Sequence, residues 1–99
     1  GKEIIAGFIR SLSSNEQAKV IYLQRLLKEY GPRLRTPYSK KLSGYKNLFE
    51  LRSSGKTSIR LIYANIKTRY IILNAFIKKS NKTPVREIET ALARYKTLT

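Results

Sequence analysis

The sequence predicts an α+β domain in which helices pack on an antiparallel β-sheet. Apolar residues recur with helical spacing at both ends of the 99-residue chain. Between these ends, residues 45–52, 58–66 and 69–78 have the composition and alternation of strands. The connections between them are short, which favours a meander of three antiparallel strands. At this length we expect one domain over residues 1–99.

The first predicted helix covers residues 2–12. Its apolar stripe consists of Ile4, Ile5, Phe8, Ile9 and Leu12. The polar residues 13–15 interrupt the pattern, and their serines offer two capping boxes for the next helix. The two pairs with that spacing are Ser13 with Glu16 and Ser14 with Gln17. Either pair begins the second helix directly after the break.

The second predicted helix extends to about residue 30. Its buried side is expected to comprise Val20, Leu23, Leu27 and Tyr30. Gly31 and Pro32 end the helix, because glycine tolerates a left-handed cap and proline cannot extend the helix. Residues 33–46 are then predicted to form a basic loop that contains a further proline and glycine.

Each predicted strand has two distinguishable faces. In the first strand one face is apolar and the other charged: Phe49 and Leu51 against Glu50 and Arg52. In the second strand the two faces carry Ile59, Leu61 and Tyr63 against Arg60 and Ile62. The third strand is the most apolar, so we expect it at the centre of the sheet.

The final predicted helix begins after a Lys-Thr-Pro segment. Thr83 is expected to cap it, with Pro84 at its first position. Its buried stripe is predicted to be Val85, Ile88, Leu92 and Tyr95. Two N-terminal helices, a meander and this helix complete the predicted architecture.

The charge of the chain indicates a polyanionic partner. Lys and Arg together number 21 against 6 acidic residues, which gives a formal net charge of +15. Within residues 31–86, fourteen basic residues are opposed by Glu50 alone. Phosphate backbones are the natural partner of such a surface. The alternative is a soluble protein that merely has an extreme isoelectric point.

The missing residue types disfavour most ordinary enzyme classes. Cys and His are absent, so the chain has no thiol nucleophile, thiolate metal site or histidine base. All six acidic residues are Glu and most are far apart in the sequence, so we expect no metal and no cofactor. The longest apolar run is far shorter than a membrane span of roughly 20 residues. We therefore expect a cytoplasmic protein without a membrane partner.

Clustered cations on the predicted strands are the candidates for chemistry. The four catalytic candidates are Arg52, Arg60, Lys78 and Lys79. Cations held on strands can stabilise charge that develops on a phosphate, although each one alone is more often a solvated surface charge. The candidates for RNA binding are Lys40, Lys41, Lys46, Lys56, Lys82 and Arg86. Tyr38 and Tyr45 can either stack on bases or pack in the fold.

An ordered series of short segments extends through nearly the whole chain. After the upstream residues 31–42, the segments are 48–52 (LFELR), 59–63 (IRLIY), 74–79 (NAFIKK), 82–84 (KTP) and 86–89 (REIE). This series resembles the RelE/HigB toxins, and in particular their phage-derived HigB branch. The resemblance implies a RelE-like fold and a type II toxin that cleaves mRNA in the ribosomal A site. It also implies a cognate antitoxin with a helix-turn-helix that holds the toxin inactive.

A mechanism for such a toxin needs neither a metal nor a protein nucleophile, because the 2′-hydroxyl of the RNA attacks the adjacent phosphate. Arg52 and Arg60 are then expected to bind that phosphate. Lys78 and Lys79 are expected to assist at the transition state or the leaving oxygen, and a lysine of lowered pKa can exchange protons. Glu50 either acts as a base or pairs with an arginine.

The chain departs from the family pattern in two ways. Family members usually begin with a β-strand, whereas this sequence is predicted to begin with a helix, so we expect an exposed sheet edge. The C-terminal tyrosine of the better-known branch has no counterpart near Pro84 and Val85, and Tyr95 is assigned to the core. Two other functions stay open: a gyrase-targeting toxin of the same fold and a non-enzymatic RNA-binding domain.

Overall fold

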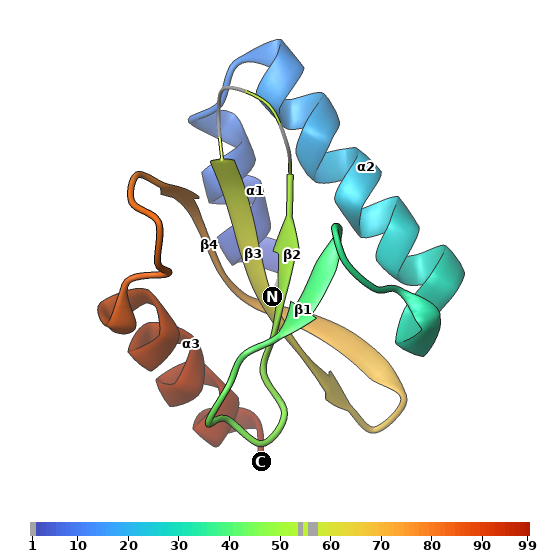
Figure 1. The fold of residues 1–99 in the computed structure, drawn as a ribbon, viewed down its shortest axis with the longest axis vertical. Helices are drawn as coiled ribbons and strands as arrows, with labels where there is room; N and C mark the ends of the chain where they lie inside the picture. Colours follow the sequence, from blue (N-terminus) through green and yellow to red (C-terminus); the bar gives the residue numbers. More distant parts are fainter. Residues whose placement is uncertain (1, 54, 56–57) are drawn as a thin grey trace.

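The computed structural model describes residues 2–53, 55 and 58–99, with side chains from residue 5 onward. The elements in chain order are α1 (Lys2–Arg10), α2 (Ser14–Tyr30), the short 3₁₀ helix η1 (Gly31–Arg33), β1 (Ser39–Lys41), β2 (Phe49–Arg52), β3 (Ser58–Ile66), β4 (Arg69–Lys78) and α3 (Val85–Leu98). The strands form one antiparallel sheet in the order β1-β2-β3-β4 (Figure 1). This is the predicted α+β architecture, with one strand more than expected.

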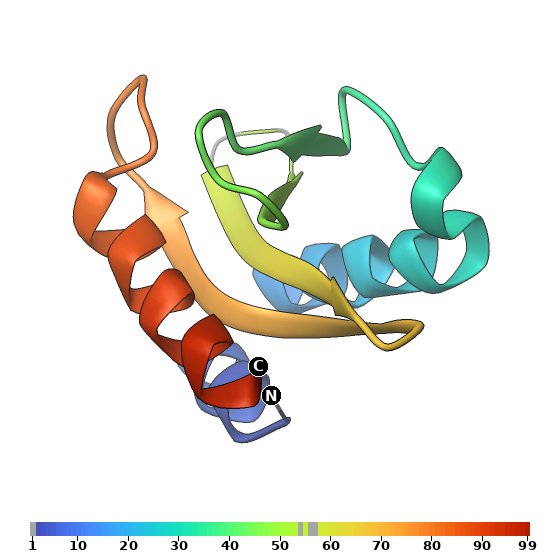
Figure 2. The same ribbon diagram turned by 90° about the horizontal axis from the view of Figure 1, so that it is seen from below.

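The sheet separates two apolar cores. Helices α1 and α2 cover one face, and α3 packs against the other (Figure 2). Fully buried residues of the first core are Val20, Leu23, Leu51, Ile59 and Leu61. Fully buried residues of the second core are Leu48, Ile62, Ala64, Leu73 and Ala91. Alternate residues of β3 therefore enter opposite cores, and Arg60 lies on the α3 side of a strand that is buried on both faces.

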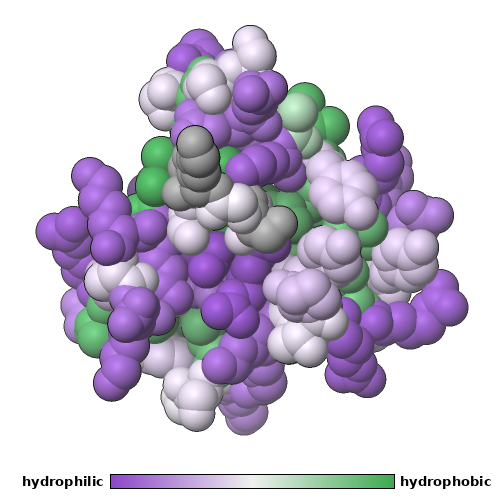
Figure 3. All heavy atoms as spheres, turned by 45° about the horizontal axis from the view of Figure 1, so that its top comes forward, coloured by the Kyte–Doolittle hydropathy of each residue, from purple (hydrophilic) through white to green (hydrophobic). Residues whose placement is uncertain are grey.

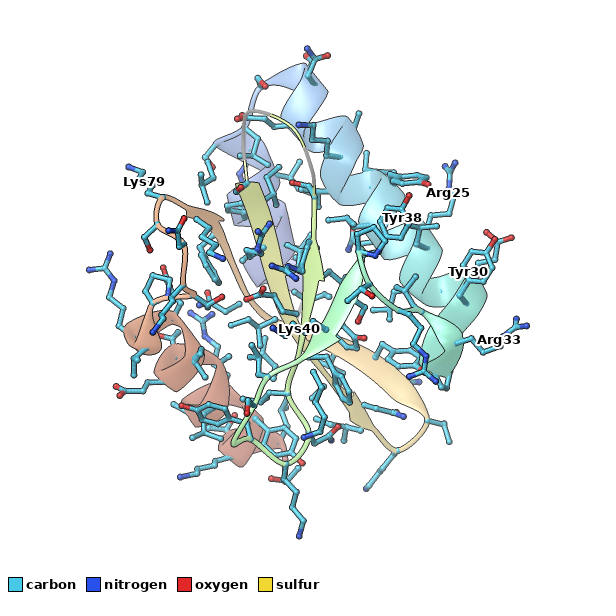
Figure 4. The ribbon with its side chains drawn as sticks, in the orientation of Figure 1. Arg25, Tyr30, Arg33, Tyr38, Lys40 and Lys79 are labelled. Atoms are coloured by element: carbon cyan, nitrogen blue, oxygen red, sulfur yellow. The ribbon has the colours of Figure 1, made fainter. Side chains whose placement is uncertain are left out.

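The N-terminal helices follow the prediction with two corrections. Helix α1 ends at Arg10, two residues early, although Leu12 is buried as expected. The capping box at the start of α2 is the Ser13–Glu16 pair, whose two reciprocal hydrogen bonds are 2.9 and 3.3 Å long. Tyr30 is 44% exposed instead of buried, because its ring points away from the sheet (Figure 4) and lies 6.0 Å from the Arg33 guanidinium.

The predicted basic loop contains a strand. β1 pairs with β2 and places Lys40 directly opposite Glu50. Three residues are too few for an alternating pattern to reveal a strand, so the sequence did not indicate it. β2 itself begins at Phe49 and not at residue 45, because the preceding residues form a turn that is closed by the Leu42 N–H donating to the Leu48 carbonyl at 2.9 Å.

β3 and β4 have the predicted bounds, but the predicted place of β4 is wrong. β4 lies at an edge of the sheet, and β2 and β3 are the central strands. Both α1 and α3 pack against β4. Its apolar composition therefore reflects the helices that cover its two faces and not a central position among the strands.

Helix α3 begins at Val85, with Pro84 as its N-cap residue. Thr83 does not cap the helix, because its hydroxyl donates a hydrogen bond to Glu50. Val85 is 61% exposed and so does not belong to the buried stripe, which Ile88 and Ala91 form with partly buried Leu92 and Tyr95. Hydrogen bonds from Asn74 and Arg94 join β4 and α3, so the loop before α3 is held beside the sheet.

Candidate functional site

The candidate site surrounds the buried carboxylate of Glu50, whose side chain is 4% exposed. Its Oε1 atom lies 3.6 Å from Arg52 Nε and 3.4 Å from Arg60 Nε. Its Oε2 atom accepts the hydrogen bond from the Thr83 hydroxyl. The structure thus shows the ion-paired alternative for Glu50, in which the carboxylate holds two arginines.

Strand register brings four cations to one face of the sheet. Arg52 lies opposite Arg60, and Lys40 lies opposite Glu50. Lys78 lies opposite Ser58, two residues before Arg60 on the same strand. Directly opposed residues of antiparallel strands share a face, as do residues two apart. We call Lys40, Arg52, Arg60 and Lys78 the basic cluster.

Arg60 is the buried member of the basic cluster, with 7% of its surface exposed. Its Nη1 donates to the carbonyls of Ser53 at 3.3 Å and Ile59 at 3.1 Å. Burial lowers the pKa of Arg60, the Glu50 carboxylate opposes that shift, and the guanidinium stays protonated. Arg60 is therefore held inside the fold and does not lie on a solvated strand face.

Lys78 and Arg52 are the cluster members that are only partly buried. The pKa of Lys78 is lowered, first by burial and then by the charge of Arg60, while Glu50 opposes the shift. Arg52 and Lys40 lower it further. Lys78 is therefore a cation that gives up its proton more readily than an ordinary lysine.

The remaining catalytic candidate, Lys79, is not brought into the basic cluster. It is exposed on the loop after β4 and points away from the sheet (Figure 4). Lys82 is exposed in the same loop and directly precedes Thr83, whose hydroxyl donates to Glu50. Arg86 is exposed on the first turn of α3.

Two further candidates for RNA binding, Lys41 and Lys46, lie outside the basic cluster. Lys41 occupies the opposite face of β1, and its ammonium donates to the Tyr45 carbonyl at 2.7 Å. Lys46 is exposed in the connection between β1 and β2. Lys56 is outside the described residues. Tyr45 is partly buried against the α3 core, which is the packing alternative for this ring.

A groove of about 410 Å³ opens beside the basic cluster. Arg52 and Arg60 line it together with Tyr38 and three residues of α2, Lys19, Tyr22 and Leu23. Figure 3 shows hydrophilic side chains gathered in the middle of this face, between the α3 side and the α2 side. The sequence interpretation missed Lys19 and Tyr22. Their spacing of three on the helix, outside the buried stripe, was the available signal.

The comparisons with known proteins place the chain in a family. Residues 7–96 match the model for "Phage derived protein Gp49-like (DUF891)". The chain belongs to the Gp49-like family. This phage-derived family is of the toxin type and HigB-like, and a toxin family implies an antitoxin partner. No curated protein matches the chain.

The match to the Gp49-like family includes the basic cluster and the groove beside it. Among the residues that the structure describes, no three His, Cys, Asp or Glu side chains come together in a way that suits a metal ion. No helix in that part of the chain has the length and apolar character needed to cross a membrane.

Proposed function

We propose that this Gp49-like chain is a RelE/HigB-type toxin of a type II toxin–antitoxin system, with one toxin domain over residues 1–99. The proposed activity is a ribosome-dependent, metal-independent cleavage of mRNA in the A site, which inhibits translation in the cytoplasm. The observation that carries the proposal is the basic cluster, in which four cations, one from each of the four strands, surround one buried carboxylate. A cognate helix-turn-helix antitoxin is the proposed inhibitor.

The phosphate of the RNA binds at Arg52, the partly exposed arginine of the basic cluster. A guanidinium offers several donors in a planar fork that matches phosphate oxygens. Glu50 and the strand pairing fix Arg52 beside Arg60, so the donors are in place before charge develops on the phosphate. Preorganised donors of this kind commonly contribute about a hundredfold to a thousandfold to a rate.

Cleavage requires one bond to form and one to break. The 2′-oxygen of the RNA forms a bond to the adjacent phosphorus, and the bond from phosphorus to the 5′-oxygen of the next nucleotide breaks. The 2′-hydroxyl loses its proton to water, and the leaving 5′-oxygen gains a proton. Lys78 is the proposed proton donor, because its lowered pKa brings proton transfer closer to neutral pH. Glu50 acts as a positioning residue in this scheme.

Arg60 acts indirectly in this scheme, through Arg52 and Lys78. Its burial and its two carbonyl acceptors leave it as a fixed positive charge that supports Arg52 and lowers the pKa of Lys78. The role of Lys79 at the transition state stays a prediction. The other exposed cations supply the long-range attraction to RNA, which depends on ionic strength.

The proposal is tested with purified protein in a translation reaction, followed by mapping of the mRNA ends. We expect new ends within translated codons, and none when ribosomes are left out. A defect in DNA supercoiling without mRNA cuts would instead favour the gyrase-targeting toxin. RNA binding without either effect would favour the non-enzymatic RNA-binding domain.

A further inference from the structure

Two tyrosine rings form part of the groove beside the basic cluster. Tyr22 of α2 is 49% exposed, and Tyr38, directly before β1, is 38% exposed. Their ring centroids lie 6.2 Å apart with an interplanar angle of 79°. In an edge-to-face pair, the ring that presents its edge keeps its own faces free of the partner. The groove therefore combines aromatic faces with the cations Lys19, Arg52 and Arg60.

The backbone fixes Tyr38 relative to the phosphate site. The Arg52 N–H donates to the Tyr38 carbonyl at 2.8 Å, so the two residues are hydrogen-bonded neighbours across the sheet. The next residue, Ser39, is buried and shares a 2.8 Å hydrogen bond with the Tyr63 hydroxyl. A molecule that stacks on the Tyr38 ring is thus held at a set position beside Arg52.

The hydroxyl of Tyr22 also suits an anionic ligand. Its hydrogen bond with Tyr38 is the main cause of a raised pKa, so the phenol stays neutral at neutral pH and adds no repulsion. Lys19 precedes Tyr22 by one turn of α2 and contributes a positive charge to the same groove. Aromatic faces next to cations are the arrangement with which proteins bind single-stranded nucleic acids.

We propose that Tyr22 and Tyr38 form a base-stacking subsite that holds one unpaired RNA base beside the phosphate bound at Arg52. The subsite rests on the proposed ribonuclease function and deepens it, because it names groups that orient the substrate. Double-stranded RNA does not fit this subsite, since its bases are stacked within the helix. Stacking tolerates every base, so the subsite positions the strand more than it selects a sequence.

The test measures binding of two labelled strands by fluorescence anisotropy. One probe is a short 2′-O-methyl RNA, which cannot be cleaved because its 2′-oxygen is blocked. The other has the same length and charge but lacks the bases. We expect Tyr22→Ala and Tyr38→Ala each to weaken binding of the first probe by about fivefold to a hundredfold. Binding of the abasic probe is expected to stay unchanged.

Tyr30→Ala is the matched control, because Tyr30 is an exposed tyrosine of the same helix that points away from the sheet (Figure 4). It is expected to bind both probes like the wild type. Tyr22→Phe keeps the aromatic ring and is expected to bind nearly normally. This variant separates loss of stacking from a disturbed fold, which thermal unfolding also checks.

Three results overturn the subsite. The first is that the tyrosine variants weaken both probes equally or neither of them. The second is that the wild type does not discriminate between the two probes. The third is that an acidic peptide displaces the RNA probe and needs both tyrosines, which would assign the groove to a protein partner. Because the probe is not cleaved, these results are separate from the outcome of the translation reaction, on which the ribonuclease proposal depends.

Discussion

At the scale of the residue, one buried carboxylate organises the candidate site. Glu50 lies between Arg52 and Arg60, and the Thr83 hydroxyl from the loop before α3 completes its contacts. Two guanidinium groups on paired strands repel each other, and the carboxylate offsets that repulsion. Glu50 therefore sets the position of the cations from which the proposed chemistry follows.

Glu50→Gln is expected to lower the free energy of unfolding by about 3 kcal/mol, because it leaves Arg60 buried without its counter-ion. Urea unfolding measures this change. The matched control is Glu89→Gln on the exposed side of α3, for which we expect a change within about 0.5 kcal/mol. Equal stability of the two variants would show that Arg60 does not need the carboxylate.

The pKa of Lys78 is expected to lie below the ordinary lysine value of 10.5, as measured by NMR titration of its side chain. In Arg52→Gln the midpoint should rise, because a repelling charge is lost and Glu50 is freed to attract the ammonium. Arg25→Gln, on the outer side of α2 (Figure 4), should leave it unchanged. An unchanged midpoint in Arg52→Gln contradicts this electrostatic account.

The proposed role of Lys78 fixes the sign of the pH dependence. A proton donor is active while it carries its proton, so cleavage slows as pH rises through the lowered pKa of Lys78. In Lys78→Arg the guanidinium at this position stays protonated over the pH range in which Lys78 loses its proton. The descending limb of the rate profile should then disappear, even where the remaining rate is lower.

At the scale of the element, long alternating segments were predictable and short or tertiary features were not. β3 and β4 have the predicted bounds because a strand pattern that continues over nine or ten residues indicates where the strand begins and ends. β1 has three residues, and only its pairing with β2 makes it a strand. The edge position of β4 could not be predicted from the sequence either, since a strand that helices cover on both faces is as apolar as a central strand.

In the candidate site, too, features with a local sequence pattern were predictable and tertiary contacts were not. Arg52, Arg60 and Lys78 were found because each lies on a strand whose face the alternation indicates. The contact between Glu50 and Thr83 joins residues that are 33 positions apart, so no local pattern predicts it. In the sequence alone, Tyr22 does not differ from other exposed helix residues, because only the fold brings α2 and Arg52 to the same groove.

The capping box at the start of α2 gives a prediction at this scale. Ser13→Ala removes the acceptor for the Glu16 N–H and is expected to cost about 1 kcal/mol in the free energy of unfolding. Ser14→Ala, one position later and outside the box, should change it by no more than about 0.5 kcal/mol. If the two alanine variants unfold at the same urea concentration, the box does not stabilise the helix.

At the scale of the whole molecule, the net charge of +15 determines how partners approach. RNA and an inhibitor that covers a basic face both need negative charge. Attraction of this kind acts before contact and therefore changes association rates more than the lifetime of a complex. Apolar contacts are expected to determine how long the antitoxin stays bound.

The association rate with the cognate antitoxin should fall as ionic strength rises, while the dissociation rate changes little. Stopped-flow mixing of the purified pair between low and physiological salt measures both rates. A flat association rate would rule out electrostatic steering. Failure of every neighbouring helix-turn-helix product to bind would count against the toxin proposal itself.

The most direct test of the central claim is single-turnover cleavage of mRNA on pre-assembled ribosomal complexes. The double variant Arg52→Ala/Lys78→Ala removes the two partly buried cations of the basic cluster. Lys67→Ala/Arg69→Ala removes the same charge from two exposed residues at the other end of β3, one in the turn after β3 and one at the first position of β4. We expect the first variant to cleave at least about a hundredfold more slowly while it stays folded, and the second to remain within a few-fold of the wild type. Near-normal cleavage by the folded cluster variant, or equal losses in both, would contradict the account.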